Sequence, residues 1–427
     1  MNYDVIVVGA GPAGSVAAKL CADKGLKTLL LEMGREPGEK NCSGTTIPLF
    51  NLYEDFPWIN DPEMPITRNV YSNTHYWVFP DGERWFKTEA VGGVVTPPRA
   101  VNVYRDLWDP WLASKAMDAG AELRKSTTVW DVIKEGDAVC GVVTHTGEKI
   151  RSGVVIAADG LNSMVSIKAG LRDKRRVDEY GVCVKYDFES TPEHIEVAFN
   201  MADGQVANES WYGGTWSSGR TGYCWLFPNY DSISVGLFTL LSDLKENPFV
   251  LMQRFLEHPL VKTKLKGAKP RYYSVRNLNS CKNGVDKTCA DGIMAVGDAA
   301  GFTCVVEGCG IPAALWSGKF AAETAIDAIA SGDVSYSGLK AYETKWKNSF
   351  IARDMAGSKK TSDWLYKTVG AEGIGLFIQH AIEGWMLKHG WSEGGHDDAC
   401  RSLMEDFIQS QLPRYLKLYG SLYEEGV

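Results

Sequence analysis

Residues 4–14 read Asp-Val-Ile-Val-Val-Gly-Ala-Gly-Pro-Ala-Gly, and this stretch decides the fold of the N-terminal part of the chain. The β-branched run at 4–8, bounded by glycine, is typical of a buried parallel strand, and a helical stretch follows it through Lys24. Residues 27–32 then predict a second strand. The three segments form a βαβ unit, which is the supersecondary motif of dinucleotide-binding folds.

The loop between the first strand and the helix carries the residues that would meet a dinucleotide. We expect Gly9 to allow a tight turn and Gly11 to let a pyrophosphate approach the backbone. Gly14 lets the helix pack closely on the strand, and Ala13 lies in the same loop at the helix N-terminus, which faces the phosphates. Glu32, at the end of the second strand, is placed to accept hydrogen bonds from the adenosine ribose. The alternative is a chance glycine cluster beside a solvated glutamate, which the strand–turn–helix context disfavours.

Two downstream segments decide between NAD and FAD, which share this fingerprint. An apolar strand ends in Asp159-Gly160, and a second one leads into Gly297-Asp298. These segments resemble the Asp-Gly and Gly-Asp motifs of the p-hydroxybenzoate-hydroxylase-like flavoprotein superfamily, and Arg105 resembles the arginine that this superfamily carries near its cofactor. The resemblance implies FAD as the cofactor, with Asp298 on its ribityl chain.

The segment from Gly308 to Ala313 also fits a Gly-x-Gly-x-x-Ala pattern, but no βαβ start precedes it. We interpret it as the flavin-facing loop, similar to the superfamily's Gly-Glu-Gly-Ile stretch, which implies that Gly308, Gly310 and Ile311 contact the cofactor. The helix that begins near Gly310 then points its positive end at the flavin pyrimidine. Because this leaves no dedicated second dinucleotide site, we expect an external electron donor: a ferredoxin, an electron-transfer flavoprotein or NAD(P)H.

A Tyr-x-Trp-x-Phe-Pro stretch followed by Val-Gly-Leu resembles the Tyr-x-Trp-x-Phe-Pro…Gly-x-Gly motif of the geranylgeranyl reductase family, whose members saturate prenyl chains of lipids, chlorophyll precursors and quinones. The residues that carry the likeness are Tyr223, Trp225, Phe227, Pro228 and Gly236. Strand alternation places the three aromatic side chains on one face, where they would form an apolar wall for a hydrocarbon. The alternative is an ordinary sheet core. The match departs at Phe238, where the family has its second glycine.

Residues Cys42-Ser43-Gly44 resemble the Cys-x-Gly that the same family carries in the segment over the flavin ring. The resemblance implies that all three contact the cofactor and makes Cys42 the candidate catalytic residue. Three roles stay open for its thiol: a proton donor, a redox group or a small packed residue. We further expect Cys42 to be the cysteine nearest the flavin, with Cys309 as its nearest thiol neighbour.

Composition limits the partners and the location of the protein. The net charge of −8 argues against nucleic acid. No apolar run is long enough to span a bilayer, and no basic leader precedes the first strand, so we expect a cytoplasmic protein, with peripheral membrane contact as an alternative. None of the ten cysteines forms a Cys-x-x-Cys pair, so we expect no metal site.

The predicted fold is therefore α/β: a Rossmann-like FAD-binding domain interrupted by a β-sheet substrate domain, with a helical C-terminal region. We assign residues 1–65, 100–175 and 270–335 to the FAD-binding domain, 66–99 and 176–269 to the substrate domain, and 336–427 to the helical region.

The resemblance implies an FAD-dependent oxidoreductase that saturates C=C bonds of a geranylgeranyl-type chain on a lipid or quinone, with hydride from the reduced flavin. An isolated alkene has no carbonyl to polarise, so the protein must supply position and exclude water. One alternative is a FixC-like protein that passes electrons to a quinone. The other is a flavin monooxygenase or halogenase, although the halogenase Trp-x-Trp-x-Ile-Pro motif does not occur in this sequence.

Overall fold

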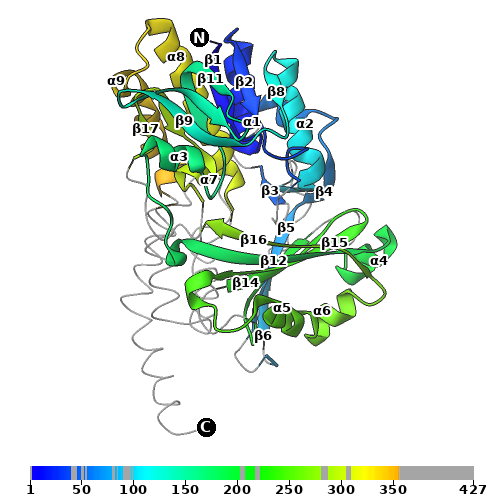
Figure 1. Ribbon diagram of the computed structural model, residues 1–427. Helices are drawn as coiled ribbons and strands as arrows, with labels where there is room; N and C mark the ends of the chain where they lie inside the picture. The colour runs from blue at the N-terminus through cyan, green and yellow to red at the C-terminus, as the bar shows by residue number, and fades with distance from the viewer. Residues whose placement is uncertain are drawn as a thin grey trace, which may run out of the picture.

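The protein is described by a computed structural model in which two large sheets face each other (Figure 1). The structure describes residues 2–355 with gaps at 40–45, 50–51, 53–54, 79–81, 84, 90–97, 99, 202–206, 217–221, 280–286, 304–308 and 354. The predicted fold class is confirmed, since a mainly parallel sheet and a separate, mainly antiparallel sheet are both present.

The first sheet is built around β1 (Tyr3–Val8), which pairs in parallel with β2 (Thr28–Leu31) and β11 (Lys149–Ala157). The residues of β1 are buried and apolar except for the half-buried Asp4, because both faces of the sheet are covered. The strand order is β17-β18-β11-β1-β2-β8, and β9 and β10 form a hairpin that pairs antiparallel with β11. The remaining strands are β8 (Glu122–Arg124), β9 (Val129–Glu135), β10 (Ala138–Thr144), β17 (Cys289–Ala290) and β18 (Ile293–Ala295).

Three helices pack side by side in this first layer: α1 (Pro12–Asp23), α2 (Arg105–Asp118) and α8 (Ile311–Ser331). Helix α1 begins with proline at its first position, where the missing N–H costs no hydrogen bond. Gly318 lets α8 approach α1 closely, because a side chain there would overlap the carbonyl of Ala13. This contact aligns the N-terminal ends of α1 and α8 at the same edge of the sheet.

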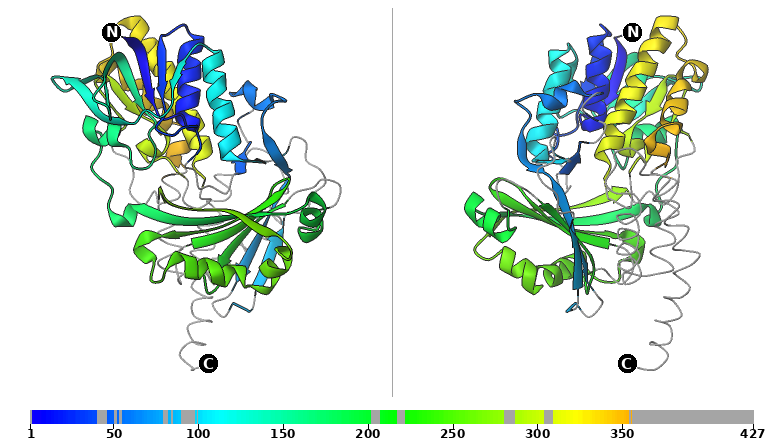
Figure 2. Two further views of the ribbon diagram at one scale, coloured as in Figure 1. Left: turned by 45° about the vertical axis from the view of Figure 1, so that its right-hand side comes forward. Right: turned by 180° about the vertical axis from the view of Figure 1, so that it is seen from behind.

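The second sheet lies below the first layer in the view of Figure 1, with α5 (Pro248–Leu256) and α6 (Pro259–Lys264) on its far face (Figures 1 and 2). Its strand order is β16-β12-β15-β14-β13-β5-β6. One face packs with α5 and α6 into an apolar core that includes Trp211, Leu226 and Phe255. The strands are β5 (Ser72–Val78), β6 (Trp85–Glu89), β12 (Tyr180–Glu189), β13 (Ala207–Gly213), β14 (Gly222–Pro228), β15 (Ser232–Leu240) and β16 (Lys269–Asn279).

A small sheet of β3 (Thr46–Pro48), β7 (Ala100–Val103) and β4 (Ile66–Val70) connects the two layers. The buried side chain of Asn102 in β7 donates hydrogen bonds to Asn208 Oδ1 and to the Pro228 carbonyl, both at 2.9 Å. These bonds fix the second sheet against the first layer, because a buried amide that lost them would remain unsatisfied.

The other helices of the described residues are short. The second sheet extends to residue 279, where β16 ends. The division of the chain into domains stays a prediction, and residues 356–427 lie outside the described residues. Within the described part, none of the helices has the length and apolar character that crossing a bilayer requires. The short helices are α3 (Met164–Ala169), α4 (Pro192–Ala198), α5 (Pro248–Leu256), α6 (Pro259–Lys264), α7 (Gly297–Ala300), α9 (Tyr336–Leu339), α10 (Ala341–Lys347), and the 3-10 turns η1 (Pro57–Asn60), η2 (Val177–Glu179) and η3 (Leu241–Asp243).

Candidate functional site

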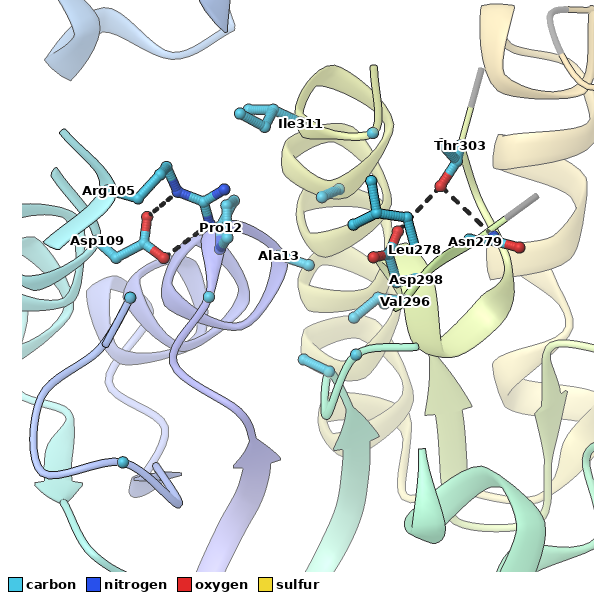
Figure 3. A pocket seen from close by; sticks show the side chains of 18 of the residues that line it. Pro12, Ala13, Arg105, Asp109, Leu278, Asn279, Val296, Asp298, Thr303 and Ile311 are labelled. Carbon is cyan, nitrogen blue, oxygen red and sulfur yellow. Dashed lines mark hydrogen bonds and ion pairs between the residues drawn. The ribbon is translucent and has the colours of Figure 1, made fainter. Parts of the chain in front are cut away.

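A long cavity lies between the two layers, and segments far apart in the sequence line it (Figure 3). Eleven of the site residues predicted from the sequence meet there. They are Gly11, Ala13, Glu32, Arg105, Gly160, Tyr223, Trp225, Gly297, Asp298, Gly310 and Ile311. The structure therefore brings the predicted cofactor motifs and part of the predicted aromatic wall to one cavity.

Gly11 shows that the lining fits a dinucleotide. Its φ of −77° is one that any residue adopts, and a Cβ built on it would meet no atom of the described residues within 4 Å. Neither backbone strain nor packing within the protein therefore requires glycine at this position. The space that a Cβ would fill belongs to the cavity, next to the N-terminus of α1, which is where a pyrophosphate binds in this fold.

Gly9 and Gly14 do not line the cavity but allow close backbone contacts next to it. Gly9 has a φ of +103°, and a side chain on it would overlap the Ala158 carbonyl. A side chain on Gly14 would overlap the carbonyl of Gly9, so α1 can approach β1 only with glycine there. These contacts are the tight turn and the close helix packing expected from the sequence.

The carboxylate of Glu32 is held in place by the backbone. Oε2 accepts from the N–H of Ala10 at 2.9 Å and Oε1 accepts from the N–H of Gly34 at 2.6 Å. The carboxylate oxygens have further lone pairs, and Glu32 lines the cavity beside Met33 and Gly34. An acceptor fixed in this way can receive hydrogen bonds from a ribose.

Arg105 reaches the cavity from the first turn of α2. Its Nε and Nη2 donate to the two carboxylate oxygens of Asp109 at 2.5 and 2.7 Å, and Figure 3 shows this pair at one side of the cavity. Burial raises the pKa of Asp109, and the charge and hydrogen bonds of Arg105 act against that rise. The bidentate pair fixes the plane of the guanidinium group, which is then oriented for contact with a ligand.

Asp298 lies on the opposite side of the cavity at the start of α7. Its Oδ1 accepts from Thr303 Oγ1 at 3.0 Å, and Thr303 Oγ1 accepts in turn from Asn279 Nδ2 at 3.4 Å. Desolvation raises the pKa of the Asp298 carboxyl, while the hydrogen bond from Thr303 and the charges of Arg175 and Arg105 lower it. The hydrogen bonds hold the carboxyl group toward the cavity as an acceptor for a hydroxyl-rich chain.

The two residues of the Asp159-Gly160 motif have different roles. The Asp159 carboxylate accepts from Ser163 Oγ and, at 3.0 Å, from the N–H of Val165, so it stabilises the start of α3. Gly160, with a φ of +75°, is the member of the pair that lines the cavity. The left-handed conformation explains why glycine stands there.

The loop before α8 is only partly described. Gly310 is the N-cap of α8 and Ile311 is its first residue, and both line the cavity, so the helix begins where the sequence predicted. Gly308 lies outside the described residues, as do Cys42, Ser43 and Gly44. The predicted contact between Cys42 and Cys309 and the role of Cys42 therefore stay predictions.

The second sheet closes the cavity with alternate residues of β14. Tyr223 and Trp225 line the cavity, and the ring of Phe227 packs beside Trp225 at a centroid distance of 6.0 Å. The intervening residues Cys224 and Leu226 point to the opposite face, into the core above α5 and α6. Pro228, at the end of β14, accepts the Asn102 bond described above rather than facing the cavity.

Two ring-on-glycine contacts shape this wall. The indole of Trp225 lies over Gly236 of β15, where any Cβ would overlap it, and its Nε1 donates to Ser234 Oγ at 3.3 Å. The ring of Phe238 lies in the same way over Gly181 of β12. Gly236 thus acts on the cavity indirectly, by setting the position of Trp225.

A buried ion pair lies on the same face of the sheet. Lys185 is paired with Gly236 across β12 and β15, and its Nζ contacts Asp187 Oδ2 at 3.0 Å. The two residues are only 6% and 8% exposed, and among the described residues Asp187 Oδ1 has no hydrogen-bond partner. The wall is therefore aromatic near the cavity and charged two strands away from Trp225.

Several lining residues were not predicted from the sequence. Leu278 and Asn279 reach the cavity because β16 pairs with β12, and no local motif announces them. Thr303 lies five residues after Asp298, and its hydroxyl donates to the Asp298 carboxylate. Its closeness to the Gly297-Asp298 motif is the one feature of the sequence that could have indicated it. Arg175, which donates to the Asp298 carbonyl at 3.1 Å and to Asn279 Oδ1 at 3.2 Å, lies in a segment that carried no motif at all.

Comparisons with known proteins agree with this geometry. A family model for FAD dependent oxidoreductases matches residues 4–171. The digeranylgeranylglycerophospholipid reductase of Methanocaldococcus jannaschii is 34% identical over 81% of this chain and 82% of its own, and protein FixC of Azorhizobium caulinodans is 31% identical over 83% and 82%. A geranylgeranyl bacteriochlorophyll reductase-like structure from Thermoplasma acidophilum covers 98% of this chain and 99% of its own, with 24% identity and a TM-score of 0.79, and it supports the fold.

The fold and the cavity define an FAD-dependent oxidoreductase. Within that class, the chain belongs to the family that contains the digeranylgeranylglycerophospholipid reductases and the FixC proteins. The resemblance to this family predicted from the motifs is confirmed, and so is FAD as the cofactor. When bound, FAD supplies a hydride acceptor and donor for two-electron chemistry.

Proposed function

We propose that this protein reduces C=C bonds of a prenyl chain carried by a lipid or a quinone. The observation that supports the proposal is the single cavity that joins the FAD-binding motifs to the aromatic face of β14 and β15. Tyr223, Trp225 and Phe238 provide a mainly apolar surface that includes one phenol and one indole group, which suits a hydrocarbon better than a polar metabolite.

The residues of the first layer would hold the cofactor. Gly11 and the N-terminus of α1 would receive the pyrophosphate, and Glu32 the adenosine ribose. Asp298 would accept a hydrogen bond from the ribityl chain, and Ile311 at the start of α8 would lie near the flavin ring. Arg105, oriented by Asp109, would contact the cofactor from the other side.

The residues of the second sheet would hold the alkene and keep water away from it. An isolated alkene has no group that a side chain can polarise, so position and a dry surface are what the protein contributes. The reaction also consumes a proton at the second alkene carbon. Cys42 is the sequence-based candidate for that donor, and its segment lies outside the described residues.

The electron donor is proposed to be external to the chain. Of the pattern that starts at residue 308, Gly310 caps α8 and Ile311 to Ala313 form its first turn, and in the described part of the chain no strand leads into it as in a βαβ unit. A ferredoxin, an electron-transfer flavoprotein or NAD(P)H would then reduce the flavin between turnovers. A hydrophobic substrate also favours work at a membrane surface, and we propose peripheral contact with a membrane in the cytoplasm.

An anaerobic reoxidation experiment tests the proposed reaction. The purified protein is reduced with dithionite and mixed with digeranylgeranylglycerophospholipid or with a short-chain quinone, and the flavin spectrum is followed. We expect the lipid to reoxidise the flavin and to gain two hydrogens per turnover, measured by mass spectrometry. A protein that reoxidises only with the quinone contradicts the proposal.

That contrary result would support a second function. FixC of Azorhizobium caulinodans is nearly as similar to this chain as the lipid reductase, and Phe238 adds an aromatic side chain to the lining, which suits a quinone head. In that case the protein would pass electrons from an electron-transfer flavoprotein to a quinone. A monooxygenase or halogenase would instead require oxygen, so reoxidation in its absence separates that class from both.

A further inference from the structure

Phe238 is a feature of this chain that the family motif does not explain. It stands where the Gly-x-Gly pattern has its second glycine, and its side chain lines the cavity while being 8% exposed. We infer that Phe238 sets the length of hydrocarbon that this protein accepts, by filling space that a glycine would leave open. This inference rests on the proposed function and names a determinant of its substrate range.

The direction of the ring follows from its contacts. Phe238 is paired with Tyr223 on one side and with Cys183 on the other. The centroids of the Phe238 and Tyr223 rings are 5.9 Å apart. The Phe238 ring lies over Gly181, and a Cβ on Gly181 would overlap its Cε2 and Cζ atoms. The ring therefore leans toward β12 and not toward β14.

The space beneath the ring has apolar walls. Gly181 is paired with Leu240 on β15 and with Leu278 on β16, and both leucines belong to the cluster around Phe238. Without the benzyl group, Gly181 and the shortened residue 238 would form the floor of a trough between these leucines. Because Leu278 already lines the cavity, the trough would open into it.

The size of the ring decides the expected effect. A benzyl side chain occupies about the volume of one isoprene unit, and burying apolar carbon favours binding. Removing the ring should therefore let one more prenyl unit enter the cavity beside Tyr223 and Trp225. The loss or gain of even one methylene in an apolar pocket changes selectivity about tenfold or more.

The test compares prenyl alcohols that differ by one isoprene unit: geraniol, farnesol and geranylgeraniol. Binding is measured from the change in the spectrum of the oxidised flavin, and turnover from anaerobic reoxidation of the reduced holoprotein. We expect Phe238→Ala to raise the preference for geranylgeraniol over farnesol about tenfold in both measurements. Phe238→Leu, which keeps a bulky side chain and is the milder change to the fold, should shift the preference in the same direction by less.

Phe188 provides a matched control, because it is also 8% exposed but packs on the opposite face of the sheet, in the core above α5 and α6. Phe188→Ala should lower stability without moving the preference. An unchanged preference in both Phe238 variants, with wild-type protein active on the alcohols, overturns the inference and leaves the proposed function intact. Wild-type protein that binds an alcohol without reducing it contradicts the proposed reductase function alone. The inference about Phe238 is then still tested, because the binding preference of the variants can be compared with that of the wild type. Wild-type protein that neither binds nor reduces any alcohol contradicts both.

Discussion

The two walls of the cavity use glycine for opposite reasons. On the side of the first layer, Gly11 has an ordinary φ and a Cβ on it would meet none of the described residues, so its missing side chain leaves room for a ligand. On the substrate side, Gly236 and Gly181 are each covered by an aromatic ring, so their missing side chains make room for the protein itself. A glycine in a motif thus marks either a ligand or a packing contact, and only its surroundings distinguish the two.

The walls also differ in how their polar groups are satisfied. Glu32 and Asp298 are each held by hydrogen bonds from residues within a few dozen positions, and both face the cavity. Lys185 and Asp187 neutralise each other inside the second sheet, away from any motif. Changes to the first wall should therefore affect the cofactor, whereas changes to the second should affect stability or substrate choice.

The largest expected effect is that of Gly11→Val. The backbone tolerates valine there, but the side chain would occupy the space next to the N-terminus of α1. We expect nearly complete loss of bound FAD, measured as visible flavin absorbance relative to protein, while the stability of the apoprotein changes by about 1 kcal/mol or less. Gly11→Ala should retain part of the cofactor, and full occupancy in the valine variant would show that the phosphate loop is placed wrongly.

A large stability effect is expected from Lys185→Met on the other wall. The substitution removes the Nζ that contacts the buried carboxylate of Asp187 at 3.0 Å, so this carboxylate loses its ion-pair partner inside the sheet. We expect a loss of about 3–5 kcal/mol, measured as the shift in urea-induced unfolding of the holoprotein. The double variant Lys185→Met with Asp187→Leu should recover most of that loss. If the single variant were as stable as wild type, the ion pair would not be buried as described.

The smallest effect is expected from Gly236→Ala. Its Cβ would overlap the indole of Trp225, which has to move, and such overpacking costs about 1–3 kcal/mol. FAD content should stay at the wild-type level because Gly236 belongs to the second wall. In a Trp225→Leu background, the same substitution should cost little. Loss of FAD in Gly236→Ala would instead show that the two walls are not independent.

Much of the cofactor wall could be predicted because each of its parts is local. The loop from Gly9 to Gly14 and the Gly297-Asp298 turn each join a strand to a helix within a few residues, so their geometry follows from the sequence. The interpretation of Asp159 was less complete. Its carboxylate stabilises α3, and Gly160 is the residue of the motif that reaches the cavity.

The substrate wall could be predicted only in part. Alternation along β14 placed Tyr223 and Trp225 on one face, because successive side chains in a strand point to opposite sides. The sequence did not reveal that Leu278 and Asn279 would join them, or that Phe238 would lie over Gly181. These contacts depend on which strands are neighbours.

The sequence by itself determined the cofactor, the family and the start of each binding helix, since these depend on short segments whose backbone geometry is set within each segment. The tertiary structure decided which side chains meet across the second sheet. Pairing of β12 with both β15 and β16 brings residues some forty to a hundred positions apart into register, and no local pattern encodes that register. The shape of the wall that the second sheet forms is therefore a property of the assembled sheet, because the ring of Phe238 can lie where it does only when Gly181 is beneath it.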